Sequence, residues 1–124
     1  TNGAVDLYHN GVKKFQTTST GITVTGDVNS VSDRRLKENI EYISTPMEIV
    51  NNLTGVYYNM IGDEDRKVGV IAQDTELALP EAVSESENGI KSVAYGNIVG
   101  VLIEALKDQQ AQIDELKEII NKNS

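Results

Sequence analysis

The segment from residue 98 to residue 122 constrains the fold more than any other part of the chain, because its side chains repeat every seven residues. The segment contains no proline, and good helix formers dominate after Gly100. The a and d positions of the repeat are occupied by Val99, Leu102, Leu106, Gln109, Ile113, Leu116 and Ile120. A repeat sustained over this length predicts a helix over about 97–122 whose a and d seam contacts other copies of the chain.

An ordinary amphipathic helix packed on its own domain is the alternative. At 1.5 Å per residue the helix extends roughly 37 Å, which is too far to lie wholly on a domain of this size. Gln109 in the seam is a polar residue of the kind that fixes register at some cost in stability. The side chains at a and d suit a dimer as well as a trimer, so the repeat predicts self-association and leaves the number of copies open.

Composition narrows the class of protein further. The chain has 124 residues, enough for one domain with an appendage, and no Cys, which excludes disulfides and Cys-based metal sites. Its net charge of −8 falls entirely on residues 32–124 and argues against nucleic acid as a partner. No apolar stretch is long enough for a membrane span. We expect no cofactor, no metal and no small-molecule substrate.

Residues 1–31 have the composition of short β-strands. They begin without Met or a signal-peptide pattern, so we interpret the chain as a fragment of a longer protein. Asn10-Gly11 between two strand-like runs predicts a tight hairpin, and Ile22 and Val24 share one face of a further strand. So few apolar side chains cannot form a core alone. The segment either packs on the rest of the chain or, as we favour, wraps around other copies as a fibrous shaft.

From Ser32 onward the composition becomes that of a small α+β domain. Thr45-Pro46-Met47-Glu48 predicts a capping box with proline at the first helical position. The elements predicted after it are the helix that this box starts and Gly55 ends, a strand at 56–60, a turn at 62–67, a more buried strand at 68–72, a helix from Thr75 to Leu79 stopped by Pro80, and a hairpin of 83–84 with 90–93 around Asn88-Gly89.

Conventional catalytic groups are scarce in the sequence. The single histidine, His9, is interpreted as a solvated strand side chain, and Asp63-Glu64-Asp65 lacks the ligand spacing of a calcium loop. Ser32 and Lys37 are a possible nucleophile and base, provided that a bend brings them within about 3 Å. The structural alternative is that Ser32 or Asp33 caps a helical turn and Lys37 lies in solvent.

Three blocks of the sequence, in this order, resemble one known family. The blocks are Ser32-Asp33-Arg34-Arg35-Leu36-Lys37-Glu38-Asn39-Ile40, then Val68-Gly69-Val70-Ile71-Ala72-Gln73 leading to Leu79-Pro80-Glu81, then Lys91-Ser92-Val93-Ala94-Tyr95. They resemble the C-terminal intramolecular chaperone domain of bacteriophage tail fibres, tailspikes and endosialidases, the peptidase S74 family. The resemblance covers Ser32 to about Ile120, and residues 2–15 also look like fibre shaft strands.

The resemblance implies a homotrimer in which residues 32–124 fold the upstream shaft, residues 1–31, and then release themselves. In this family the domain cuts immediately before the motif serine, so the resemblance implies cleavage of the Val31–Ser32 bond. Ser32 would be the nucleophile and Lys37 its general base, with the acyl group shifting to oxygen before water releases it. The implied partners are other copies of the chain and its own shaft. The implied location is a virion fibre or spike precursor, acting in the infected host cytoplasm, from which the chaperone is released.

Two other functions remain open at this point. The first is a structural trimerisation cap that stays attached, with Ser32 and Lys37 inactive. The second is a membrane-tethered transcription factor of a host, a class in which related domains occur. The neutral, Gly- and Thr-rich upstream segment argues against the second, because no basic DNA-binding region is visible in it.

Overall fold

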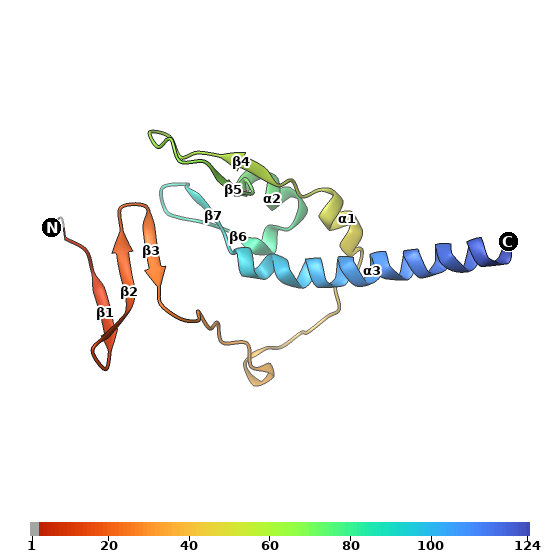
Figure 1. Cartoon of the computed structure of the whole chain (residues 1–124), viewed down its shortest axis with the longest axis horizontal. Helices are drawn as coiled ribbons and strands as arrows, with labels where there is room; N and C mark the ends of the chain where they lie inside the picture. The colour runs from red at the N-terminus through yellow and green to blue at the C-terminus, as the bar shows by residue number, and fades with distance from the viewer. Residues whose placement is uncertain (1–2) are drawn as a thin grey trace. The chain divides into compact units, whose positions relative to one another are not determined.

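The computed structural model describes residues 3–124, which fall into two compact units. Unit 1 ends at Ile40 and unit 2 is Glu41–Ser124, and each is described by itself. Small antiparallel sheets are combined with helices, the longest of which is at the C-terminal end (Figure 1). This is the mixed α+β architecture predicted from the sequence. The boundary predicted between residues 31 and 32 lies inside unit 1 and stays a prediction about function.

Unit 1 contains a three-stranded antiparallel sheet in the order β1, β2, β3. Its strands are Asp6–His9, Val12–Thr18 and Gly21–Val24. The turn between β1 and β2 has positive φ angles at both central residues, 49° at Asn10 and 76° at Gly11, as a tight hairpin turn requires. The predicted Asn-Gly hairpin is therefore confirmed.

The sheet of unit 1 has no interior of its own. Phe15 in β2 lies opposite Leu7 in β1 and Val24 in β3, which makes one apolar row across the three strands. None of residues 3–40 is buried, and Leu7 remains 57% exposed. A single sheet with both faces open gains little from apolar burial, so another surface is needed to stabilise it.

Unit 2 begins with the short helix α1, Pro46–Asn51. Pro46 occupies the first helical position as predicted, but the predicted capping box is wrong. Thr45 has a left-handed backbone with φ at 51° and makes no side-chain capping bond, whereas a capping residue is normally extended. The helix also ends before Gly55, because Asn52 donates from its side chain to the Glu48 carbonyl at 2.8 Å and closes the last turn.

Two hairpins and a helix follow α1. They are β4 (Val56–Tyr58) paired with β5 (Lys67–Gly69), then α2 (Ala72–Ala78), a 3-10 turn η2 (Pro80–Ala82), and β6 (Val83–Glu85) paired with β7 (Lys91–Val93). The second hairpin agrees with the sequence prediction, and Pro80 follows α2 as expected. The helix itself starts three positions before the predicted Thr75, because Ile71 already accepts its first backbone bond.

The second strand of the first hairpin is not the buried strand that was predicted. Val68 in β5 pairs with Tyr57 in β4, and the two side chains are 69% and 70% exposed. The hairpin is an isolated two-stranded sheet, so one of its faces lacks a covering layer within unit 2. The strand also stops at Gly69, since the chain turns into α2 three residues later.

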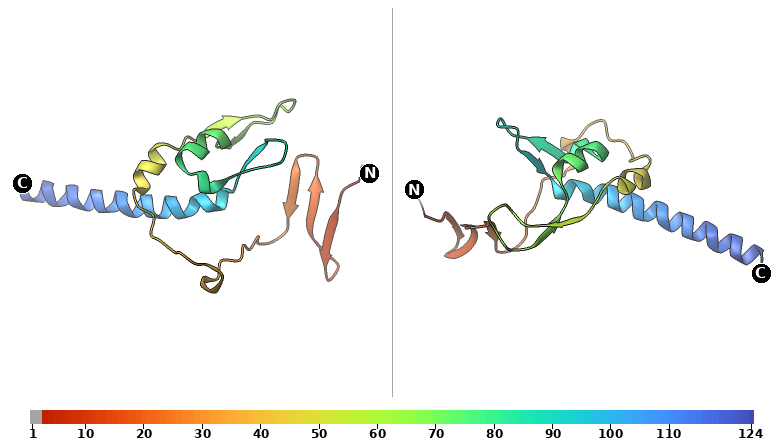
Figure 2. Two further views of the ribbon diagram at one scale, coloured as in Figure 1. Left: turned by 180° about the vertical axis from the view of Figure 1, so that it is seen from behind. Right: turned by 90° about the horizontal axis from the view of Figure 1, so that it is seen from above.

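The core of unit 2 lies where α3 (Tyr95–Lys122) crosses the other elements. Its buried apolar members are Leu79, Ala82, Ile98, Val101 and Ala105, with Ile49, Val50, Leu53 and Val93 packed around them. Figure 2 shows α1 lying beside the first half of α3 in both views. The buried positions on α3 are spaced by three and four residues, so they form one stripe along the helix.

The second half of α3 projects beyond this core (Figures 1 and 2). Its last buried residue is Ala105, and every residue from Gln109 to Ser124 is exposed. The helix has 28 residues and starts at Tyr95, two positions earlier than predicted. At 1.5 Å per residue it is about 42 Å long. The helix is thus an element that unit 2 covers only in part.

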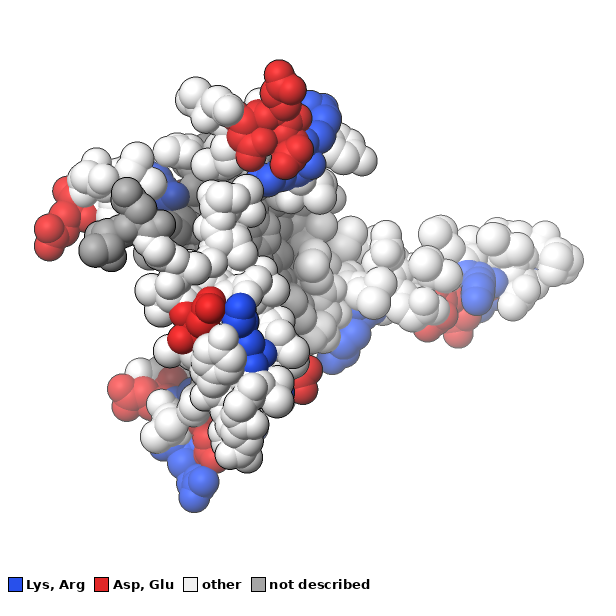
Figure 3. Space-filling model, turned by 60° about the vertical axis from the view of Figure 1, so that its left-hand side comes forward, with Lys and Arg blue, Asp and Glu red and all other residues white. Residues whose placement is uncertain are grey.

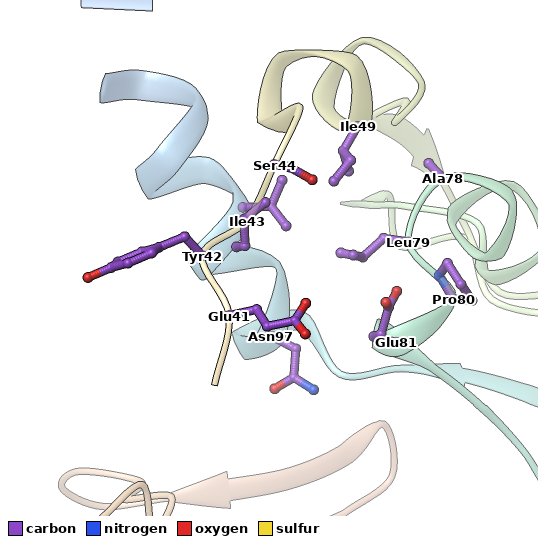
Figure 4. A pocket seen from close by; sticks show the side chains of 11 residues that line it. Glu41, Tyr42, Ile43, Ser44, Ile49, Ala78, Leu79, Pro80, Glu81 and Asn97 are labelled. Carbon is purple, nitrogen blue, oxygen red and sulfur yellow. The ribbon is translucent and has the colours of Figure 1, made fainter. Parts of the chain in front are cut away.

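A pocket in unit 2 lies between α1, α2, α3 and the segment 41–44 (Figure 4). Ile43, Ile49 and Leu79 point into it, whereas Tyr42 points away and is 97% exposed. The Ile43 side chain reaches α3 where Gly100 leaves room for it, at 3.8 Å from the position of a Cβ there. The pocket is the place where residues 41–44 are anchored on the core.

Candidate active site and helix seam

A single 3-10 turn, η1 (Arg34–Leu36), connects the two residues of the predicted Ser–Lys pair. Leu36 N donates to Asp33 O at 3.0 Å, and Lys37 N donates to Arg34 O at 3.1 Å. These bonds fold the backbone back on itself. As a result Lys37 Nζ donates to Ser32 Oγ at 2.5 Å. The bend that the sequence prediction required is present, and all of it lies within unit 1.

The turn is capped by the side chain of Asp33. Its Oδ1 accepts a hydrogen bond from Arg35 N at 2.9 Å, as an N-cap carboxylate does. The Arg35 guanidinium binds the same carboxylate, with Nε donating to Oδ1 at 3.1 Å and Nη2 to Oδ2 at 2.9 Å. The Arg35 side chain, followed by its backbone N–H, lowers the pKa of Asp33, and Asp33 raises the pKa of Arg35.

The structural alternative from the sequence is therefore present in part. Asp33 does cap a helical turn, but the Lys37 amine contacts Ser32 rather than only solvent. Both side chains are exposed, and Val31 on the other side of the predicted scissile bond is 82% exposed. Lys37 is the donor in this contact. A lysine acts as a general base only after it has lost a proton and accepts one from the serine hydroxyl.

The remaining candidate side chains have structural surroundings. His9 lies in β1 and is exposed, as the sequence predicted. Asp63 accepts a hydrogen bond from Asp65 N at 2.9 Å and lies 4.0 Å from Lys67 Nζ, so it closes the turn between β4 and β5. Within residues 3–124, no group of three or more His, Asp or Glu side chains is placed to hold a metal ion.

The a and d side chains of the heptad repeat lie away from the core of unit 2. The apolar members, Val99, Leu102, Leu106, Ile113, Leu116 and Ile120, are between 41% and 67% exposed. The buried stripe of Ile98, Val101 and Ala105 occupies the c and g positions instead. Because the buried c and g positions are not the a and d positions, the contacts of α3 with the rest of unit 2 leave the seam uncovered. Figure 3 shows the projecting part of α3 with mostly uncharged atoms on the side facing the viewer.

Three seam neighbours were missed by the sequence argument. Ile103 and Ile119 flank the seam and are 52% and 47% exposed, and Met47 of α1 lines a groove together with Leu102 and Leu106. The two isoleucines could have been found at the e and g positions of the repeat. Met47 comes from a different element, so only the packing of α1 on α3 brings it to this surface.

Among residues 3–124, the structure has no helix with the length and apolar character needed to cross a membrane.

Comparisons with known proteins agree with the motif analysis. Residues 32–84 match the peptidase S74 family, described as chaperone of endosialidase. The long tail fiber protein Gp37 of Enterobacteria phage T2 is 32% identical over 130 residues, which cover 94% of this chain and 10% of the relative. Gp37 of Salmonella phage S16 is 32% identical over 73% of this chain and 14% of its own length. Gp37 of Enterobacteria phage M1 is 35% identical over 73% of this chain and 40% of its own length.

This chain therefore spans about a tenth of the length of the T2 relative that it matches. The family match begins at Ser32, directly before Asp33, the N-cap of η1, and continues through α1 and α2 to Ser84, the middle residue of β6. Residues 32–84 therefore belong to a peptidase S74 chaperone domain, and the chain is similar to phage long tail fiber proteins, as the motifs indicated.

Proposed function

We propose that this chain is the trimerisation chaperone of a phage tail fibre, which folds the upstream shaft and then cuts itself free at the Val31–Ser32 bond. The observation that carries the cleavage step is the 2.5 Å contact between Lys37 Nζ and Ser32 Oγ. Residues 1–31 are the end of the shaft and residues 32–124 are the chaperone. The fibre is a component of the virion, assembled in the infected host cytoplasm.

Self-association is supported by the two surfaces that a single chain leaves open. The heptad seam of α3 is exposed along its whole length, and none of residues 3–40 is buried. Three chaperone domains that join through their long helices raise the effective concentration of the three shaft strands. Because non-local strand pairing is slow, alignment before pairing favours one register.

The cleavage step uses only groups of the chain and water. Lys37 Nζ accepts the Ser32 hydroxyl proton as Oγ attacks the carbonyl carbon of Val31. The Ser32 nitrogen leaves as an amine and takes a proton, which leaves the Val31 acyl group as an ester on Oγ. Water then hydrolyses the ester to give the Val31 carboxylate and restores the serine hydroxyl. The reaction is a single turnover for each chain.

Exposure of the dyad supports a cleavage step that waits for assembly. Lys37 and Ser32 are both solvent-exposed in the single chain. Burial favours the neutral amine, which is the form that acts as a base. We infer that a neighbouring chain supplies this burial, so that cutting follows association.

The test is the intact mass of the expressed chain, followed with time, together with its N-terminal residue. We expect a fragment that starts at Ser32, and no fragment from Ser32→Ala or Lys37→Ala although both variants sediment as trimers. Ser30→Ala and Lys117→Ala are matched controls that keep cutting. A fragment that persists in both dyad variants would refute the proposed dyad.

A structural cap that stays attached is the second candidate, and the exposed amine of Lys37 favours it. It predicts stable trimers and an intact wild-type chain after prolonged incubation. The same mass measurement therefore separates the two functions.

A further inference from the structure

Asp33 lies between the two residues of the proposed dyad in the sequence and beside them in space. Its carboxylate accepts three hydrogen bonds, all from Arg35: the backbone N–H and Nε reach Oδ1, and Nη2 reaches Oδ2. The Asp6 carboxylate of the same unit, by contrast, has one ion pair, with Lys13 Nζ at 3.3 Å. The geometry indicates that the Asp33–Arg35 pair stabilises the local backbone conformation.

The first consequence of the Asp33 cap concerns the backbone between Ser32 and Lys37. Residues five positions apart in an extended chain are separated by roughly 16 Å. Here the 3-10 turn that Asp33 caps returns the chain, so that Lys37 Nζ reaches Ser32 Oγ. The cap satisfies the Arg35 N–H, which has no partner inside so short a turn. Without the cap, the turn is one of many conformations open to an exposed segment.

The second consequence concerns charge. Asp33 is the carboxylate nearest in sequence to Lys37 on the Ser32 side of the turn, and a mobile Asp33 would compete with Ser32 for the lysine amine. The Arg35 fork occupies both carboxylate oxygens, so the acid is held away from that competition. The lowered pKa of Asp33 and the raised pKa of Arg35 agree with a formed pair.

We propose that Asp33 and Arg35 form a clamp that positions Lys37 on Ser32 and so sets the rate of self-cleavage. Both are positioning residues, because they act through the dyad. This inference rests on the proposed function, and it adds a separate claim: the turn must be held by the paired side chains, beyond the presence of Ser32 and Lys37.

The test measures the cleavage rate after cell-free synthesis of the full chain, by intact mass against time. We expect Asp33→Ala and Arg35→Ala each to slow cutting roughly tenfold, in line with the loss of a helix cap. The variant that carries both substitutions should cut at about the same rate as each single variant, because the two residues act as a unit. Asp33→Asn keeps an oxygen that can cap the turn but loses the two-oxygen contact with the Arg35 guanidinium, so it should recover only part of the rate.

Matched controls separate the clamp from general effects of charge or folding. Arg34→Ala removes the neighbouring guanidinium, and Asp27→Ala removes another exposed carboxylate, and both should cut at the wild-type rate. Equal slowing by Arg34→Ala and Arg35→Ala, or wild-type rates in Asp33→Ala and Arg35→Ala, would overturn the clamp. If the Ser32→Ala variant cut at the wild-type rate, that result would instead overturn the proposed function.

A measurement that needs no cleavage tests the clamp directly. In the Ser32→Ala chain, the Asp33 carboxyl should titrate in NMR below its ordinary value of 3.8, because Arg35 stabilises the charged form. The turn is therefore stable above that value and opens as the pH falls through the lowered pKa. Arg35→Ala should return the titration toward 3.8, and an unchanged titration would overturn the clamp.

Discussion

The phenolic oxygen of Tyr95 lies against Gly69 and accepts a hydrogen bond from the backbone N–H of Val70 at 3.1 Å. A Cβ on Gly69 would lie 2.5 Å from this oxygen, closer than side chains approach. Tyr95 is the first residue of α3 and Gly69 the last of β5, so the contact ties the first hairpin to the long helix. Two of the sequence blocks that carry the family resemblance meet at this point.

The first prediction follows from that contact. Gly69→Ala should destabilise unit 2 by roughly 1–3 kcal/mol, because the added methyl group displaces the Tyr95 ring and breaks its bond to Val70. Denaturant unfolding followed by circular dichroism measures the change. Gly96→Ala is the matched control, since nothing lies within 4 Å of its Cβ position and alanine is the better helix former. Equal stability of the wild type and Gly69→Ala would contradict the prediction.

The second prediction concerns pH and the ion pair of Lys91. Its Nζ lies 2.6 Å from Glu76 of α2 and 3.7 Å from Glu85 of β6. The hydrogen bond to Glu76 is the main cause that raises the pKa of Lys91 above 10.5, and the charges of both glutamates add to it. A raised pKa contributes stability that is complete below pH 10.5 and is lost as the pH rises through the folded value.

Tyrosines also ionise in this pH range, but they do so in both the wild type and Lys91→Gln. The difference in stability between the two proteins therefore isolates the effect of the ion pair. The wild type should be more stable than the variant by a constant amount from pH 7 to about 10. The difference should then shrink at higher pH. Urea unfolding at a series of pH values measures it, and a difference that grows above pH 10.5 would show that the pair is not formed.

The third prediction concerns the seam of α3. Ile113→Asp should abolish self-association while unit 2 stays folded, since Ile113 lies beyond Ala105, the last buried position of the helix. An unpaired charge in a buried seam costs roughly 3–5 kcal/mol. Asn121→Asp adds the same charge at a b position and should associate like the wild type. Sedimentation across a concentration series measures both, and trimers of Ile113→Asp would mean that this seam is not the interface.

The fourth prediction concerns Gln109, the polar member of the seam. Gln109→Leu should stabilise the assembly by roughly 1–3 kcal/mol, because a buried amide loses its desolvation cost. The same change should broaden the distribution of assembly sizes, since a polar seam residue fixes register and number of copies. Native mass spectrometry with thermal unfolding tests both effects. If the assembly became more stable but kept a single, unchanged size, residues other than Gln109 would determine the number of copies.

Local signals in the sequence were sufficient for several elements. Asn10-Gly11 supplied the positive φ angles of the first hairpin, and Pro46 set the first residue of α1. The heptad repeat located α3 within two residues of its observed start. In each case the backbone preference of one or two residues, or a long periodic pattern, agrees with the final structure.

Other features depended on contacts that no local pattern carries. The capping box is wrong because Thr45 has a left-handed backbone, directly after the segment 41–44 that lines the pocket on the core. The exposure of Val68 follows from the absence of a third strand within that sheet. The approach of Lys37 to Ser32 required knowledge of the Asp33 cap, which the sequence offered only as an alternative to a dyad.

The part of α3 from residue 110 onward has a consequence for engineering, because it lies beyond Ala105, the last buried residue of the helix, and beyond the groove that Gln109 lines with α1. It is an interchangeable module: a different zipper of equal length, fused in phase with Ala105, would leave the interior of the domain intact. In the assembly proposed above, the replacement helix would then set the number of copies and the register of the attached strands.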